Sequence, residues 1–152
     1  MTPALRPATI ADISTLLELM QQYCAFDHLP FDAETRQRTL RQFITTERLG
    51  KLWIISVAEE SVGYLALTLG FSFEYGGYDA FIDEVYIRES HRGLGLGKQA
   101  LSFAEEACRT LGVRALHLEV ERENTNAHAL YHKVGFIEHE RYLMTKLLAP
   151  NR

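Results

Sequence analysis

The sequence has few cysteines, no excess of positive charge and no long apolar run. Its two cysteines, Cys24 and Cys108, have no second cysteine at disulfide or metal spacing, which indicates buried thiols in a reducing compartment. Sixteen Lys and Arg against twenty Asp and Glu disfavour nucleic acid as a partner, because that binding depends on phosphate neutralisation. The N-terminus lacks the apolar core of a signal peptide, and no run reaches the roughly 18 apolar residues of a membrane span. These absences predict a cytoplasmic protein that binds neither membrane nor nucleic acid.

The composition that remains is that of an ordinary globular protein. Hydrophobic residues make up 47% and charged residues 24% of the 152 residues, close to the average of folded domains. A chain of this length buries enough surface to fold without a metal or disulfide. We therefore expect one domain over residues 1–152.

Hydrophobic periodicity predicts strands interspersed with helices. Apolar residues at helical spacing predict helices, and alternating β-formers predict strands. Glycines mark the ends of several predicted helices. The predicted strands are 4–9, 52–58, 62–69, 80–87, 113–120, 136–139 and 141–148, and the predicted helices are 13–26, 32–49, 97–111 and 124–133. This order predicts an α/β fold whose mixed, mostly antiparallel central sheet has six to seven strands and is flanked by about four helices.

The segment with the clearest chemistry is a glycine-rich turn between a strand and a long helix. It consists of Arg92, Gly93, Leu94, Gly95, Leu96, Gly97 and Lys98. Unpaired amides and the positive end of a helix dipole attract phosphate oxygens, and glycines allow the backbone to come close to them. The turn therefore predicts a pyrophosphate site.

A dinucleotide is one alternative ligand for this turn. Gly95-x-Gly97-x-x-Ala100 matches the dinucleotide fingerprint, and Glu119 lies about twenty residues further on. However, five polar residues, 88–92, separate the strand from the first glycine, whereas the fingerprint places that glycine almost at the strand end. The spacing argues against NAD.

Three motifs in the same order resemble the GNAT superfamily of N-acetyltransferases. The superfamily's acyl-CoA loop has the form Q/R-x-x-G-x-G/A, which is similar to Arg92-x-x-Gly95-x-Gly97. Its fourth strand resembles residues 82–87, and its last helix resembles residues 124–136. The resemblance covers nearly the whole chain and implies transfer of an acetyl group from acetyl-CoA to an amine.

The resemblance also implies a cofactor site. Pantetheine would lie in a wedge between the splayed fourth and fifth strands, residues 92–98 would hold the pyrophosphate, and Asn124 would contact the pantetheine arm. Tyr131 matches a family tyrosine beside the acetyl-CoA sulfur, and a phenol that is protonated at neutral pH can donate to a leaving thiolate. The backbone of the fourth strand would bond to pantetheine through Val85, Tyr86 and Ile87.

Three acids are candidates for the base that removes a proton from the amine. Asp83 and Glu84 interrupt an apolar strand side by side, and strand alternation predicts that they point to opposite faces. Glu119 resembles the base of branches that act on protein N-termini. We rank Asp83 and Glu84 above Glu119.

The acceptor site is expected opposite the cofactor, in segments where aromatic and acidic residues mix. Tyr23, Asp27, Tyr75 and Asp83 would bind an alkylammonium by charge and cation–π contact. These segments look like those of the polyamine or thialysine acetyltransferases. No metal is expected, because a solvated helix face explains His128 and His132 better than a ligand pair does.

These observations predict an N-acetyltransferase that uses acetyl-CoA as co-substrate, without a metal, and acts on a primary amine of a small cationic acceptor. Because the cysteines lie outside the motifs, we expect direct attack in a ternary complex and no acyl-cysteine. A protein N-terminal or lysine acetyltransferase and a non-catalytic acyl-CoA-binding module are the alternatives. A homodimer is compatible with this prediction.

Overall fold

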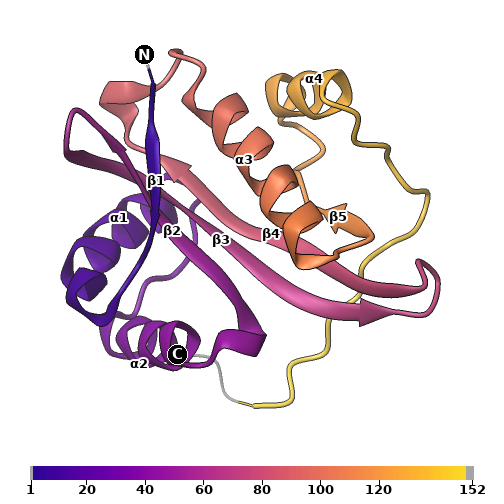
Figure 1. The fold of residues 1–152 in the computed structure, drawn as a ribbon, viewed down its shortest axis with the longest axis horizontal. Coiled ribbons are helices and arrows are strands. Elements are labelled where there is room, and N and C mark those ends of the chain that lie inside the picture. The colour runs from indigo at the N-terminus through magenta and orange to yellow at the C-terminus, as the bar shows by residue number, and fades with distance from the viewer. Residues whose placement is uncertain (1, 150–152) are drawn as a thin grey trace. The chain divides into compact units, whose positions relative to one another are not determined.

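The computed structural model describes residues 2–149, which form two compact units that divide after Leu118. The first unit contains the whole sheet and helices α1, α2 and α3, and the second contains helix α4 and the segment after it (Figure 1). Among the described residues, every helix is too short or too polar to cross a lipid bilayer. The expectation of a single domain over residues 1–152 stays a prediction.

The sheet has five strands in sequence order. They are β1 (Ala4–Pro7), β2 (Gly50–Val57), β3 (Glu60–Ser72), β4 (Gly77–Ile87) and β5 (Ala115–His117). The first four strands pair antiparallel, whereas β4 and β5 pair in parallel through a crossover that contains α3. This confirms the predicted mixed, mostly antiparallel sheet.

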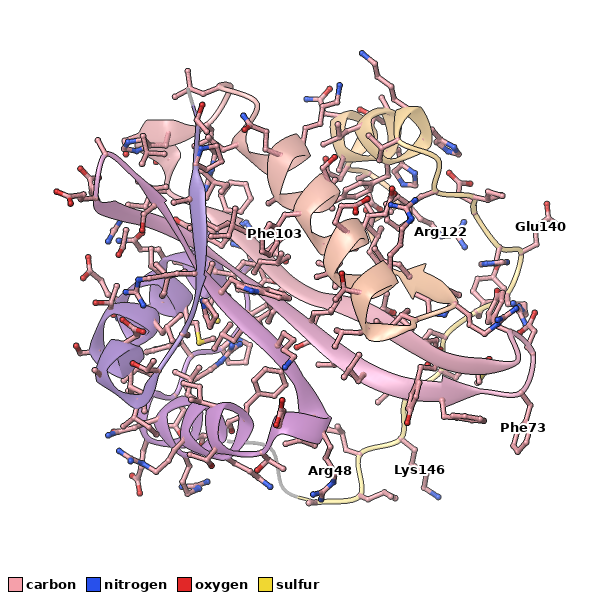
Figure 2. All side chains as sticks on the ribbon, in the orientation of Figure 1. Arg48, Phe73, Phe103, Arg122, Glu140 and Lys146 are labelled. Atoms are coloured by element: carbon pink, nitrogen blue, oxygen red, sulfur yellow. The ribbon has the colours of Figure 1, made fainter. Side chains whose placement is uncertain are left out.

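Helices cover both faces of this sheet. Helices α1 (Ile13–Phe26) and α2 (Ala33–Thr45) cover one face, and α3 (Leu96–Leu111) covers the other (Figure 1). On the α1–α2 face, helix residues such as Leu16 and Leu40 form one buried cluster with strand residues such as Ile54. On the α3 face, the rings of Trp53 and Phe103 meet edge to face at 5.1 Å (Figure 2). The alternation of apolar residues along β2 therefore supplies two cores.

The hairpin between β2 and β3 has a two-residue turn of unusual composition. Val57 pairs with Glu60, and the two residues between them, Ala58 and Glu59, have φ values of 50° and 67°. Such type I′ turns match the strand twist but favour Asn and Gly. The turn thus holds two side-chain-bearing residues in the left-handed region, at a cost in stability.

The predicted strands 136–139 and 141–148 are wrong, and so is the expected total of six to seven strands. Residues 136–149 have no strand structure, and apolar side chains such as Ile137 and Leu148 are 82% and 91% exposed. The predicted strand 113–120 shortens to β5. β-formers in alternation become a strand only when another strand satisfies their backbone groups, and pairing is not a local property.

Candidate functional site

The glycine-rich turn presents unpaired backbone amides at the start of α3. Gly93 and Gly95 have φ values of 76° and 80°, which only glycine adopts readily, and Gly95 is the N-cap of α3. No side chain caps this helix end. A Cβ added at Gly93, Gly95 or Gly97 would meet nothing within 4 Å. The amides of the first turn therefore face open space, as an anion site requires.

The edge of β4 beside this turn is open. The pairing of β4 with β5 covers only Asp79 to Phe81. Further along β4, the Arg88 amide donates to the Val62 carbonyl on β3, so the alternation of an antiparallel ladder turns the polar groups of Val85 and Ile87 to the other, open edge. These backbone groups lie where the sequence predicts pantetheine contacts.

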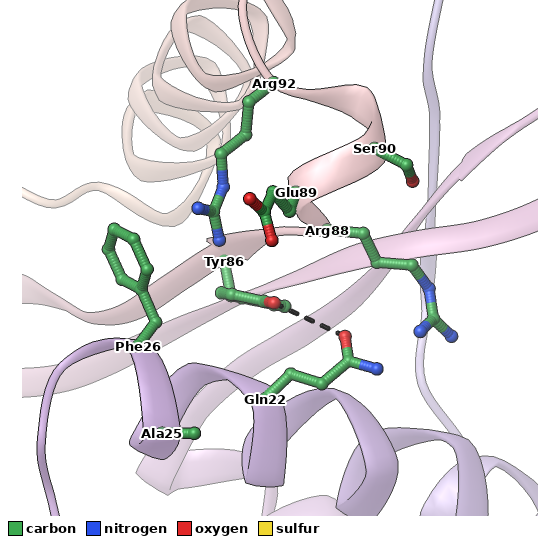
Figure 3. A pocket seen from close by; sticks show the side chains of 8 residues that line it. All are labelled: Gln22, Ala25, Phe26, Tyr86, Arg88, Glu89, Ser90 and Arg92. Atoms are coloured by element: carbon green, nitrogen blue, oxygen red, sulfur yellow. Dashed lines mark hydrogen bonds between the residues drawn. The ribbon is translucent and has the colours of Figure 1, made fainter.

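A pocket of about 820 Å³ lies between the last turns of α1 and the end of β4 (Figure 3). Arg92 projects into it: its Nε donates to the Ile87 carbonyl at 3.0 Å, and its guanidinium carbon lies 4.2 Å from the Phe26 ring centre. The Tyr86 ring is 5.4 Å away, and its hydroxyl donates to Gln22. Arg92 thus connects the glycine-rich turn to the open edge of β4.

Glu84 lies at the centre of a polar network under α1 and α2. Nη1 of Arg36 lies 3.0 Å from both carboxylate oxygens, and the Tyr64 hydroxyl donates to Oε1 at 2.8 Å. Nη2 of the same arginine lies 3.4 Å from Sγ of Cys24. Only 14% of the Glu84 side chain and 24% of the Arg36 side chain are exposed. Glu84 is therefore held by two donors.

Asp83 differs from its neighbour because it is the extra residue of a β-bulge. Ala66 faces Glu84 and Leu67 faces Ile82, which leaves Asp83 without an opposite residue on β3. The bulge interrupts the alternation that predicts opposite faces for the two acids. Asp83 is exposed, close to the point where β5 stops pairing with β4. It carries a carboxylate that solvent can reach.

The predicted acceptor residues fall into separate places. The Tyr23 ring packs edge to face on Tyr64 and Tyr86, and burial followed by the charge of Glu84 raises the pKa of the Tyr23 hydroxyl. Asp27 is exposed at the end of α1. Tyr75 lies in the turn between β3 and β4, where its ring is 5.3 Å from that of His117. The charge of Glu84 thus acts on Tyr23, whose ring packs against the Glu84 partner Tyr64.

Sequence reasoning missed a histidine–aspartate pair next to the strand divergence. His117 pairs in register with Phe81, and its Nε2 lies 3.1 Å from Oδ2 of Asp79. Both side chains are mostly buried. The parallel register of β4 and β5 brings these residues together over 38 positions. Locally, His117 is the one polar residue of β5, but Asp79 is only one of three acids in β4, so no local pattern pairs the two.

The second unit contains the remaining predicted site residues. Asn124 caps α4 (Thr125–Lys133) by accepting a hydrogen bond from the Ala127 amide. Burial raises the pKa of the Tyr131 hydroxyl, so this phenol is protonated at neutral pH. Its ring contacts Phe136. Glu119 is exposed at the start of this unit.

The two thiols are poor nucleophiles. Burial raises the pKa of Cys24, and it raises that of Cys108 to about 11. Both sulfurs therefore stay protonated at neutral pH, and the thiol is much less nucleophilic than the thiolate. This supports transfer without an acyl-cysteine.

Comparison with known proteins agrees with the fold. Residues 14–136 match the sequence model of the acetyltransferase (GNAT) family. The chain therefore belongs to this family of acetyl-CoA-dependent acyltransferases.

Two curated relatives are named as acetyltransferases. An uncharacterized N-acetyltransferase of Bacillus subtilis, YycN, is 35% identical over 63% of this chain and 61% of its own. The matched region thus spans less than two thirds of that relative. An L-methionine sulfoximine/L-methionine sulfone acetyltransferase of Pseudomonas aeruginosa is 27% identical over 90% of this chain and 81% of its own.

Solved structures have the same fold. An integron cassette protein from the mobile metagenome of a salt marsh has a TM-score of 0.86 and 37% identity, and the match covers 97% of this chain and 91% of the other. An acetyltransferase from Clostridium acetobutylicum, solved with acetyl-CoA, has a TM-score of 0.80 and 17% identity, with 97% of both chains covered. At that identity, the second likeness concerns the fold alone.

Proposed function

We propose that this protein transfers the acetyl group of acetyl-CoA to a primary amine of a small cationic acceptor, by direct attack in a ternary complex. The observation that carries the proposal is the pairing of an uncapped, glycine-lined helix start with an open strand edge. The first suits a pyrophosphate and the second suits an amide-containing arm. Acetyl-CoA has both parts, a pyrophosphate followed by an amide-containing arm, so a single cofactor would occupy both features.

The cofactor contacts follow from this arrangement. The amides of residues 93–98 bind the pyrophosphate, and Arg92 and Lys98 add positive charge beside it. The outward polar groups of Val85 and the outward amide of Ile87 on β4 bind the pantetheine amides, while the Ile87 carbonyl accepts from Arg92. The resemblance of residues 124–136 to the last helix of the family assigns Asn124 to the same arm.

The chemistry needs one base and one acid. Asp83 accepts a proton from the ammonium, directly or through water, and the free amine attacks the thioester carbonyl carbon. The new C–N bond forms as the C–S bond breaks, and Tyr131 donates its proton to the leaving sulfur. The second proton that the attacking nitrogen loses returns to the phenolate, directly or through water. We favour Asp83 over Glu84 because Asp83 is exposed at the bulge, whereas Arg36 and Tyr64 already occupy Glu84. Glu119 is the remaining candidate.

A positive acceptor fits the acids and aromatic rings around α1 and β4. Asp27 and Asp83 are exposed carboxylates, and Tyr23 offers a ring to an alkylammonium. Polyamines and thialysine are acceptors of this class. The relative of Salmonella typhimurium that is named an aminoalkylphosphonate N-acetyltransferase, 28% identical over 59% of this chain, is consistent with a small amine.

The direct test is a screen for CoA-thiol release with polyamines, amino acids, aminoglycosides and peptides with a free N-terminus. We expect a small diamine or polyamine to give the highest kcat/KM. Turnover of peptides alone would contradict the acceptor class, and acetyl-CoA binding without turnover of any amine would favour an acyl-CoA-binding module.

Variants of the three acids then identify the base. Asp83→Asn should lower kcat/KM most near neutral pH and less at high pH, where the free amine is abundant. Glu84→Gln should alter stability more than the pH profile. A normal profile in Asp83→Asn with lost activity in Glu119→Gln would place the base in the second unit and favour a peptide acceptor.

A further inference from the structure

One face of α4 carries two imidazoles that point at the same carboxylate. Nδ1 of His128 lies 3.0 Å from Oε1 of Glu138, and Nε2 of His132 lies 2.9 Å from the same oxygen. The two imidazole rings are stacked, with centres 6.4 Å apart. The histidines are one helical turn apart, and the chain turns back after Gly135 to bring in the glutamate. Sequence spacing alone did not reveal this third group.

The three side chains are arranged as ligands of one ion. Each offers one ligand atom, and these atoms all lie within 4.8 Å of one another. Zinc bonds to nitrogen and oxygen of roughly 2.0–2.1 Å place tetrahedral ligands about 3.3 Å apart. The two nitrogen–oxygen distances of 3.0 and 2.9 Å would therefore have to lengthen by only a few tenths of an ångström. The side chains of His132 and Glu138 are more than half exposed and so have room for this adjustment.

A contact behind the cluster matches the usual surroundings of a metal-bound histidine. Nε2 of His128 lies 3.2 Å from the backbone carbonyl of Glu121. Histidine ligands generally donate their second ring N–H to such an acceptor, which fixes the tautomer and directs the other nitrogen at the metal. Here the carbonyl assigns the proton to Nε2 and leaves the lone pair on Nδ1, the atom that faces Glu138.

The hydrogen-bonding groups around His128 do not match a neutral imidazole. His128 faces an acceptor from each ring nitrogen, because both the Glu138 carboxylate and the Glu121 carbonyl accept hydrogen bonds. A neutral imidazole has only one N–H to donate. Either a second ring proton on Nδ1 or a cation between Nδ1 and the carboxylate satisfies this side of the ring, and the cation does so with a neutral imidazole.

We propose that His128, His132 and Glu138 bind a divalent first-row transition metal ion, with Zn²⁺ as the reference ion. Two imidazoles and one carboxylate form a ligand set suited to Zn²⁺, Ni²⁺ or Cu²⁺ and poorly suited to Mg²⁺ or Ca²⁺. Water completes the coordination, because His132 and Glu138 are more than half exposed. The ion joins α4 to the segment after Gly135 and so stabilises the turn between them. The proposal is independent of the proposed acetyl transfer.

Calorimetric titration of the untagged, EDTA-treated full chain with ZnCl₂ tests the site. We expect one Zn²⁺ per chain and at least a tenfold loss of affinity in both His132→Gln and Glu138→Gln. MgCl₂ should give no binding. Cys24 and Cys108 do not compete, because both are buried.

His139→Gln is the matched control, since His139 is exposed next to Glu138 but outside the cluster. This variant should bind Zn²⁺ like the wild type. A thermal melt with and without Zn²⁺ gives a second readout, and the melting temperature should rise in the wild type and His139→Gln only. Absence of stoichiometric binding to the wild type, or equal Zn²⁺ affinity in His132→Gln and the wild type, would overturn the proposal.

Discussion

Gly97 offers a sharp test of the phosphate site, because nothing in the protein itself requires glycine there. It lies in the first turn of α3, and a Cβ at this position would meet no atom within 4 Å. Alanine is a better helix former than glycine and has less freedom in the unfolded chain. Glycine at this position is explained only if a ligand approaches the backbone closely.

The two effects of Gly97→Ala therefore have opposite signs. The free energy of unfolding should rise by about 0.5–1 kcal/mol, which raises the melting temperature by roughly 1–4 °C in a chain of this size. Acetyl-CoA affinity should fall, because the added methyl group keeps a phosphate oxygen away from the helix amides. One charge-assisted hydrogen bond contributes roughly 1.5–3 kcal/mol, so its loss weakens binding by about 10–150-fold.

Calorimetry with CoA and thermal melts measure both quantities, and Gly112→Ala is the control. Gly112 ends the same helix with a φ of 76° and equally open surroundings. Alanine there is strained, so Gly112→Ala should be less stable but bind CoA normally. Wild-type CoA affinity in Gly97→Ala would contradict the proposed phosphate site, because the phosphates would then not lie close to the amides of the first turn.

Three other changes probe Tyr131 on α4, the Glu84 network and the hairpin turn. Tyr131→Phe should keep acetyl-CoA affinity but lower single-turnover rates by roughly 10²–10⁴-fold; an unchanged rate would exclude the phenol as the acid. Glu84→Gln should lower the free energy of unfolding by about 2–3 kcal/mol in urea, less than the roughly 3–5 of a fully buried pair because both side chains are partly exposed. If Arg36→Gln combined with Glu84→Gln costs the full sum of the single changes, the ion pair does not stabilise the fold. Glu59→Gly should stabilise by about 0.5–1 kcal/mol, since it relieves a φ of 67°; a lower melting temperature would contradict the strain at this turn.

Features that depend only on neighbouring residues could be predicted from the sequence alone. The glycine-rich turn and the start of α3 lie within a few residues of each other, so their backbone geometry follows from glycine's freedom and from the unpaired amides of any helix start. The α1 and α3 patterns were equally readable, because an apolar stripe is a property of one helix. The family motifs are local for the same reason.

The contacts between groups that are distant in the sequence depend on the tertiary structure and could not be predicted. The register of β3 and β4 places the bulge at Asp83, and the packing of α2 brings Arg36 to Glu84 across 48 positions. The Asp79–His117 pair likewise depends on a strand register. A one-residue change in register would move every such side chain to the other face. Residues 136–149 failed as strands for the related reason that a strand exists only when a second segment pairs with it.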